Sequence, residues 1–299
     1  MRFLIVLLTT CFLSTQSYSQ YYYYSDSHFD RSWIFEVGGG IGGMNTISDV
    51  GGPKGKGGMY INDINIQNTR LSSSFYFGAL YEQLIGVRLE ATWGSVQAAD
   101  SVLKSASLES SLSRYNRNLN FKSTINEIAI IAEFHPLSLW PKEGPRLLSP
   151  YIMAGLGYFR FNPQINLNGR DIDLRPLSLE GQDFKEYKER ERYNTKQTNI
   201  PVGLGVKYEL NQTFTFRLEA LHRFLFTDYL DDVSMRYIDR SLFTKYLPPL
   251  EAAQANAIYD LKREIPPIAG KARGNADSND AYMTLSLKVG VTLGREKRR

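Results

Sequence analysis

Three aspartates, Asp228, Asp231 and Asp232, lie within five positions, directly after a segment rich in phenylalanine and leucine. Grouped carboxylates could hold a calcium ion, act as catalytic acid and base, or cap a turn. The cluster lacks the alternating acidic positions and the following glycine of an EF-hand loop. Calcium is therefore a minor alternative, and we expect carboxylates that cap a turn or pair with nearby arginines.

Other residue types that carry chemistry are sparse. Histidine occurs only as His28, His135 and His222, and no Ser-His-acid spacing can be argued for them. The Gly-rich stretch at 49–60 lacks the GxxxxGK[ST] spacing of a phosphate-binding loop. A net charge of +4 on 299 residues does not suggest a nucleic-acid partner. We expect a protein that is not an enzyme and that holds no cofactor and no metal.

Residues 1–20 have the pattern of a secretory signal peptide. A basic start and an apolar run too short to span a membrane precede a polar segment. Cleavage is expected close to Ser19 or Gln20, which leaves 21–299 as a single domain. The only cysteine, Cys11, lies inside the signal, so thiol chemistry is excluded from the mature chain. A retained N-terminal anchor and lipidation at Cys11 are the alternatives.

Apolar residues alternate with polar ones along eight segments, which is the period of a β-strand. In the clearest segment, Ile85 and Val87 share one face, while Arg88 and Glu90 share the other. Segments of about ten residues match the length that a tilted strand needs to cross a bilayer. The predicted strands are 31–43, 72–83, 84–95, 118–134, 150–162, 198–210, 213–227 and 281–294.

The faces opposite the apolar ones carry charges of both signs. A soluble β-sandwich would bury its apolar faces, whereas a membrane barrel turns them to lipid and encloses the charges. Strand length and aromatic strand ends favour the barrel, and eight strands leave an interior about wide enough for side chains to fill. We predict an all-β, eight-stranded antiparallel outer-membrane β-barrel whose lumen is plugged by ion pairs. The charges on the faces predicted to turn to the lumen are Arg88, Glu90, Glu127, Glu133, Lys207, Glu209, Arg217, Glu219 and Lys288.

The connections between these strands alternate in length, as they do in outer-membrane barrels, which have short periplasmic turns and long external loops. Residues 251–264 are expected to form a short helix between two proline pairs. The long connections, expected outside, are 44–71, 96–117, 163–197 and 228–280, and those expected in the periplasm are 83–84, 135–149 and 211–212.

Five strings follow one another in a specific order: YNRNLNFKSTINEIAIIAEF at 115–134, SPYIMAGLGYFRFNP at 149–163, LRPLSLEGQ at 174–182, IPVGLGVKYEL at 200–210 and FTDYLDDVS at 226–234. In these strings the chain resembles the PorG-like family of Bacteroidota outer-membrane proteins, also described as domain of unknown function 6089. The residues that carry the resemblance most specifically are Arg117, Asn118, Leu119, Phe121, Glu180, Gly181, Gln182, Asp228, Tyr229, Asp231 and Asp232.

The resemblance implies an eight-stranded barrel without catalytic residues. It also implies a part in type IX protein secretion and gliding motility, as an outer-membrane component that contacts outer-membrane lipids and a periplasmic lipoprotein ring. With that partner, the binding surface is expected at the 135–149 link. One alternative is a small porin or adhesin-like barrel that binds ligands through its external loops. Another is a lipid-modifying enzyme that depends on His222 or a nearby serine.

Overall fold

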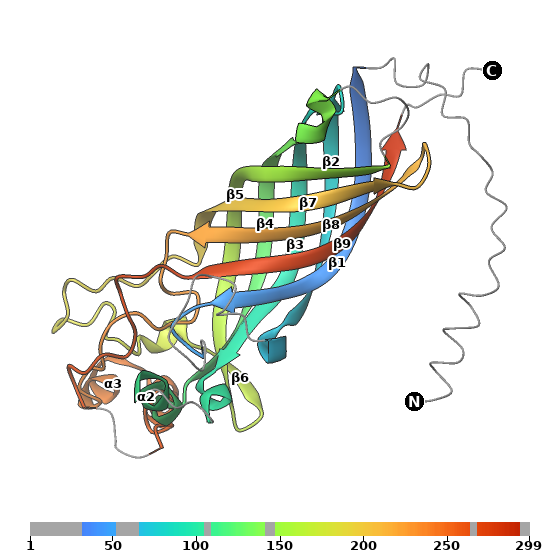
Figure 1. The fold of residues 1–299 in the computed structure, drawn as a ribbon. Helices are drawn as coiled ribbons and strands as arrows, with labels where there is room; N and C mark the ends of the chain where they lie inside the picture. The colour runs from blue at the N-terminus through green and yellow to red at the C-terminus, as the bar shows by residue number, and fades with distance from the viewer. Residues whose placement is uncertain (1–31, 52–65, 105–108, 141–146, 264–267, 294–299) are drawn as a thin grey trace, which may run out of the picture.

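The computed structural model describes residues 32–51, 66–104, 109–140, 147–263 and 268–293 (Figure 1). The expected signal peptide at 1–20 and His28 lie outside the described residues. Among the helices in these ranges, none is long and apolar enough to cross a membrane.

Eight antiparallel strands close into a barrel. Each barrel strand pairs with the barrel strands before and after it in the chain, and the first strand, β1, pairs with the last, β9. The sheet therefore has no open edge along the barrel wall, which satisfies the backbone hydrogen bonds of every strand. The barrel strands are β1 (Trp33–Ile47), β2 (Arg70–Tyr81), β3 (Ile85–Ala99), β4 (Asn120–Phe134), β5 (Leu148–Leu167), β7 (Lys196–Glu209), β8 (Phe214–Leu225) and β9 (Ala281–Leu293).

The two faces of each strand differ as the alternation predicts. On β3, Val87 and Leu89 are each 53% exposed on the outside, whereas Arg88 and Glu90 are 2% exposed on the inside. The outer surface of the barrel is therefore apolar and its interior is charged. This arrangement confirms the predicted eight-stranded antiparallel barrel.

One hairpin of the structure is absent from the sequence prediction. Strand β5 continues past the predicted end at residue 162 and pairs with the short β6 (Arg170–Asp173). Asn168 and Gly169 connect the two strands with φ of 53° and 81°. Both values lie in the left-handed region that a two-residue type I′ turn requires, and Asn-Gly is its usual sequence. The sequence therefore held a signal for this hairpin that the strand count missed.

The two ends of the barrel are unlike (Figure 1). At the end that we call the turn end, short links join β2 to β3 and β7 to β8, and a longer link with the 3-10 helix η5 (Pro136–Leu139) joins β4 to β5. The first residues of β1 and the last residues of β9 also lie at the turn end. At the opposite end, the loop end, lie the four long connections. The predicted alternation of long and short connections is confirmed.

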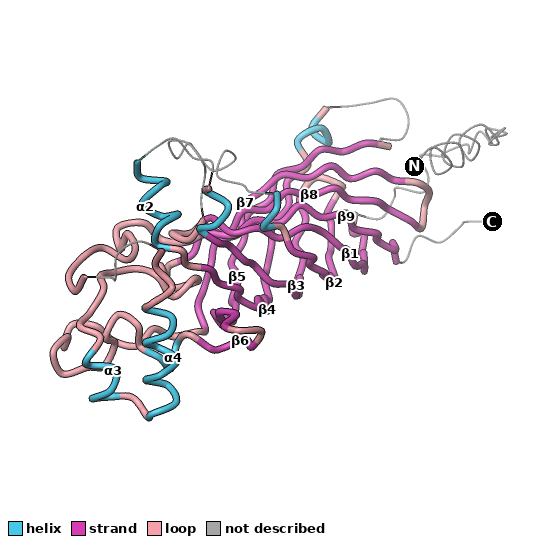
Figure 2. The backbone as a smooth tube through the Cα atoms, turned by 90° about the horizontal axis from the view of Figure 1, so that it is seen from below, coloured by secondary structure: helices cyan, strands magenta, loops and turns pink. Residues whose placement is uncertain are grey.

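The long connections fold together into a cap, which comprises the described residues of 48–69, 100–119, 168–195 and 226–280. Helices and loops of this cap gather beyond the loop end of the strands (Figure 2). The predicted helix at 251–264 is present with earlier bounds, whereas a helix before β4 was not predicted. The helices of the cap are η3 (Ile66–Asn68), η4 (Asp100–Leu103), α2 (Glu109–Arg117), η6 (Arg175–Leu177), α3 (Ser241–Tyr246) and α4 (Pro249–Tyr259).

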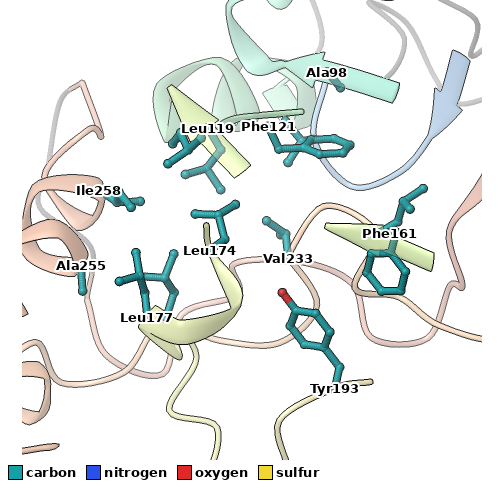
Figure 3. Packing of buried hydrophobic residues seen from close by; sticks show 14 of the residues in the cluster. Ala98, Leu119, Phe121, Phe161, Leu174, Leu177, Tyr193, Val233, Ala255 and Ile258 are labelled. Atoms are coloured by element: carbon teal, nitrogen blue, oxygen red, sulfur yellow. The ribbon is translucent and has the colours of Figure 1, made fainter. Parts of the chain in front are cut away.

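An apolar core holds the cap on the barrel (Figure 3). Leu174 and Leu177 from one connection pack in the same buried cluster as Val233 and Ile258 from another. Phe161 on β5 extends this cluster into the mouth of the barrel. Since burial of a large apolar side chain contributes about 1.5–3 kcal/mol, such a cluster can order long connections that would otherwise sample many conformations.

Candidate functional site

The centre of the barrel is filled by one network of ion pairs. Arg88 contacts three carboxylates: Glu219 at 2.6 Å, Glu133 at 2.8 Å and Glu90 at 2.9 Å. Lys288 links two of them, because its ammonium also contacts Glu90 and lies 2.8 Å from Glu219. All of these side chains are buried. Mutual pairing offsets the high cost of removing each charge from water.

A second arginine extends the network toward the turn end. Arg217 contacts Glu133 at 2.9 Å and Glu36 at 2.7 Å. The hydroxyl of Tyr76 donates a hydrogen bond to Glu36, and that of Tyr151 donates one to Glu219. The inward position of Glu36 was readable from the alternation in its strand. It was not among the predicted lumen charges.

The predicted lumen charges all lie inside the barrel, although they do not form a single cluster. Arg88, Glu90, Arg217, Glu219 and Lys288 belong to the central network. Lys207 pairs instead with Glu209, at 2.9 Å. An additional buried pair lies nearer the loop end, where Glu127, a predicted inward-facing charge, meets Arg223 at 3.1 Å. Arg223 was not among the predicted lumen charges.

The lumen pockets formed by the described residues are too small for solutes. The pocket beside Glu36 and Arg217 has a volume of about 10 Å³, and so does the pocket beside Glu90 and Arg223. A cavity of this size is at the lower limit for a single water molecule. The ion-pair network can therefore hold the eight strands in a fixed geometry, but it leaves no room for a solute.

A serine, a histidine and a glutamate meet at the turn end, although no Ser-His-acid spacing could be argued from the sequence. His135 Nδ1 lies 3.1 Å from Ser149 Oγ, and its Nε2 lies 3.3 Å from Glu133 Oε2. The arrangement could not be read from the sequence because the pairing of β4 with β5 brings Ser149 beside His135, which lies 14 residues earlier.

Four features set this group apart from a hydrolytic triad. Ser149 is only 7% exposed, and the His135 ring stacks on Tyr151 at 4.7 Å. Glu133 is already held by two arginines, Arg88 and Arg217. The backbone N–H of His135 also donates to the Leu84 carbonyl at 2.8 Å. The group fixes the described start of this link, residues 135–140, to the barrel. His222 lies apart, on β8 beside Phe224.

In the cap, Arg117 joins three connections. Its guanidinium contacts Asp100 at 2.9 Å and donates to the carbonyls of Arg273, at 2.6 Å, and Asp49, at 2.7 Å. Asn118 follows with φ of 58° and donates to the Leu261 carbonyl. The remaining residues of this motif, Leu119 and Phe121, point into the apolar core of the cap.

Glu180 is the second tie between connections. It accepts the backbone N–H groups of Ser234 and Met235, each at 3.0 Å, and pairs with Arg273 at 2.9 Å. The turn that presents it contains Gly181 with φ of 80°, a conformation that favours glycine. Gln182 completes the turn by accepting the Glu180 N–H.

The aspartates of the opening cluster lie at a turn, as predicted, and all three are buried. Asp231 accepts the N–H groups of Val50 at 3.1 Å and Val233 at 2.9 Å. Asp232 has φ of 64° and accepts the Tyr193 hydroxyl at 2.8 Å. Its arginine partner is Arg273 of the cap, at 3.4 Å, and not an arginine of the lumen.

Asp228 differs from its neighbours. In the described part of the chain, neither of its carboxylate oxygens makes a hydrogen bond of good geometry, although the Ser234 hydroxyl is near enough to lower its pKa. Burial, with repulsion from Asp49 and Asp231, outweighs that contact and raises the pKa of Asp228 to about 8. The ring of Tyr229 stacks on Tyr193 at 4.7 Å.

Burial also raises the pKa of the other two aspartates. The pKa of Asp231 rises to about 7, with repulsion from Asp49 as the next cause. The pKa of Asp232 also rises to about 7, because burial outweighs the opposing charge of Arg273. No group of three or more His, Cys, Asp or Glu side chains in the described ranges is arranged to hold a metal ion.

Comparison with known proteins gives a family match. A model described as "Domain of unknown function (DUF6089)" matches residues 18–239, which include every motif residue placed above. No curated protein matches the sequence.

Solved structures with similar folds are barrels of outer membranes. Neisserial surface protein A has a TM-score of 0.39 and 11% identity, covering 86% of this chain and 96% of that one. Ail, the attachment invasion locus protein of Yersinia pestis, has a TM-score of 0.39 and 8% identity in its complex with the heparin analogue sucrose octasulfate, covering 88% and 100%. OprG from Pseudomonas aeruginosa has a TM-score of 0.36 and 11% identity, covering 88% and 97%.

Proposed function

The chain belongs to the DUF6089 family, and on that premise we propose that it is a non-enzymatic β-barrel of the outer membrane that anchors a periplasmic partner. The observation that carries the membrane location is the apolar outer face of the barrel. Large apolar side chains on that face include Leu89, Ile130, Leu204 and Leu287, each more than half exposed. Water would oppose such a belt, whereas lipid solvates it.

Aromatic residues at the turn end of the belt support this location. Trp33 and Tyr81 pack at 5.0 Å on neighbouring strands, and both are exposed on the outside. Phe35 and Phe77 stack one step further along at 6.3 Å. Membrane barrels carry such aromatic girdles where the apolar band meets the headgroups.

The closed lumen favours anchoring over transport. The central ion pairs leave pockets of only about 10 Å³, so a porin role has little structural support. We infer that the barrel acts through its two ends. Planar-bilayer recordings should show no steady conductance, and ion-selective currents from the purified protein would overturn this part of the proposal.

For the partner, we propose the periplasmic lipoprotein ring of type IX secretion, to which the family resemblance points. What supports a partner at the turn end is the apolar surface of the β4–β5 link. Leu139 is 58% exposed and Trp140 is 62% exposed, and Leu147 and Leu148, which follow in the chain after 141–146, are also exposed. A cluster of exposed leucine and tryptophan is typical of a protein contact.

Photo-crosslinking in the native envelope tests the partner. A crosslinking amino acid at Leu139 should capture a periplasmic lipoprotein, whereas one at Leu250, an exposed apolar residue of the cap, should not. Deletion of the gene should also stop secretion by this route. Crosslinks formed only from Leu250, or intact secretion in the deletion strain, would contradict the proposal.

The cap supports a second candidate function, recognition of an external ligand in the manner of an adhesin. The observation in its favour is that the four connections fold into one body with its own apolar core. Removal of residues 226–263 with closure of the loop would then abolish ligand capture by whole cells while leaving secretion unchanged. Loss of secretion without loss of capture would argue against it.

A further inference from the structure

We propose that a polar pocket in the side of the cap binds a small, hydroxyl-bearing organic cation, of which an amino sugar is the simplest representative. The pocket, which we call the rim pocket, lies at the loop end of β1 and has a volume of about 200 Å³. Its lining includes Asn45, Ser48, Asp49, Asn279 and Asp280. Binding at the rim pocket does not depend on the proposed function. Only the direction from which the ligand arrives, outside the cell, rests on the proposed membrane orientation.

The size and lining of the rim pocket favour a small polar ligand. Pockets for drug-sized molecules usually have volumes of about 300–1,000 Å³, so this one is suited to a single ring. Amide, hydroxyl and carboxylate groups make up most of its wall. Groups of this kind form hydrogen bonds with hydroxyl and amino groups, as recognition of a sugar requires.

The charge of the wall favours a cation. Asp49 and Asp280 line the pocket, whereas Asp228 and Asp231 do not line it but are near enough to repel the charge of Asp280. Burial raises the pKa of Asp280 well above its usual range, with repulsion from Asp231 and then Asp228 as the next causes. Burial likewise raises the pKa of Asp49.

The charges of Arg117 and Arg114 act on Asp49, but burial outweighs them and keeps its pKa raised. Arg114, which also lines the pocket, donates to the Gly51 carbonyl at 2.9 Å. Arg117 is held by Asp100 at 2.9 Å. Asp228 is 7% exposed, and both of its oxygens are buried without a hydrogen bond of good geometry. An ammonium group in the pocket would supply the positive charge that this cluster lacks.

The wall is preorganised. Asp49 accepts the N–H of Asn275, and Asp280 accepts the N–H of Leu230 at 2.9 Å. By contrast, the Ser48 hydroxyl is buried without a hydrogen-bond partner in the described ranges. Buried polar atoms are usually paired, so this hydroxyl is a polar group of the wall whose hydrogen bonds are not yet used.

A metal ion and an anion fit the pocket less well. The described residues contain no carboxylate group arranged to hold a metal, and about 200 Å³ exceeds what an ion with a few waters needs. An anionic ligand would meet the repulsion of the same carboxylates that favour a cation.

The test is a titration of the full-length protein in detergent micelles with glucosamine, glucose, gluconate and calcium. Glucosamine should bind at least about tenfold tighter than glucose, which is a difference of about 1.4 kcal/mol, and gluconate and calcium should not compete with it. Because a bound cation favours the ionised carboxylates, binding should release protons and should strengthen as the pH rises from 5 to 7, a range in which the amine of glucosamine stays protonated. Equal affinity for glucose and glucosamine, displacement by calcium, or no binding would overturn the proposal.

Two variants locate the site. Asp49→Asn keeps an oxygen that can accept the Asn275 N–H but removes the charge, so glucosamine affinity should fall about tenfold or more. Ser48→Ala removes a hydroxyl without an internal partner, so it should weaken binding without changing stability. Glu189→Gln is the matched control, since it removes one carboxylate that is 70% exposed elsewhere on the cap. Unchanged binding in Asp49→Asn, or equal loss in Glu189→Gln, would overturn the site. Crosslinking from Leu139 is a separate readout, so its failure would bear on the secretion partner alone.

Discussion

Arg273 and Glu180 form a buried ion pair, 2.9 Å between Nη1 and Oε1, across 93 residues of sequence. The pair joins the connection after β5 to the connection before β9. Because Glu180 also accepts two backbone N–H groups near residue 234, a single carboxylate sets the positions of two long loops. Shared cross-braces of this kind make the cap one folded body.

The first prediction concerns this pair. Arg273→Met should leave Glu180 and Asp232 buried without their cation, and loss of one member of a buried pair costs about 3–5 kcal/mol. We expect the cap to become sensitive to limited proteolysis while the barrel keeps its heat-modifiable mobility on gels. Arg240→Met is the matched control, because the Arg240–Asp260 pair is about half exposed and such pairs contribute about 0–1 kcal/mol. Equal protease resistance of the two variants would contradict the prediction.

The barrel was predictable from sequence because the alternation of inward and outward side chains depends only on neighbouring residues of one strand. A pleated strand places neighbouring side chains on opposite faces, so the inward position of Arg217 and the outward position of Leu218 follow from period two alone. Which carboxylate each arginine meets depends on strand register across the lumen. The contact between Arg88 and Glu219, 131 residues apart, therefore could not be derived from one sequence.

The cap was not predictable by the same reasoning. Its motif residues were identified by resemblance, but their partners are distant in sequence. Asp231 binds the N–H of Val50, 181 residues away, and nothing in a short window signals that contact. A charged cluster after a strand normally indicates a solvated turn. Here the apolar core of the cap covers it, so the burial was missed.

The second prediction concerns the centre of the lumen. Arg88→Met removes a positive charge that Glu90, Glu133 and Glu219 share, so their negative charge is no longer balanced. We expect the free energy of unfolding of the barrel to fall by about 3–5 kcal/mol. Denaturant unfolding in lipid vesicles measures this. Adding Glu219→Met to the Arg88→Met variant should recover part of the loss, because the uncompensated charge is reduced. A double variant that is less stable than the sum of both single changes would contradict the network.

The third prediction concerns the pH dependence of the cap. The pKa values of Asp231 and Asp232 rise to about 7 and that of Asp228 to about 8, so in the folded cap these groups hold protons that the unfolded chain releases near pH 4. Their contribution to stability is therefore complete below about pH 4 and is lost as the pH rises through 7 to 8. Protease resistance of the cap should fall between pH 5 and pH 8.

Asp228→Asn isolates this effect. Neither oxygen of Asp228 makes a hydrogen bond of good geometry, so removal of its charge should stabilise the cap at pH 8 and flatten the pH profile. Asp231→Asn provides the contrast, because both of its oxygens accept backbone N–H groups and the amide can replace only one acceptor. We expect it to loosen residues 48–51 at every pH. The prediction fails if Asp228→Asn lowers protease resistance at pH 8 as much as Asp231→Asn does.

The fourth prediction concerns the Ser149–His135–Glu133 group. A fluorophosphonate probe, which labels activated serines, should not label Ser149 in the folded protein, because that serine is 7% exposed and Glu133 is bound by two arginines. His135→Gln should instead loosen the link at the turn end, because a hydrogen-bonded contact to Ser149 is lost. Hydrogen exchange at the backbone amides of 135–140 measures that loosening. Labelling of the wild-type protein that disappears in Ser149→Ala would show a reactive serine and would reopen the assignment of the barrel as non-enzymatic.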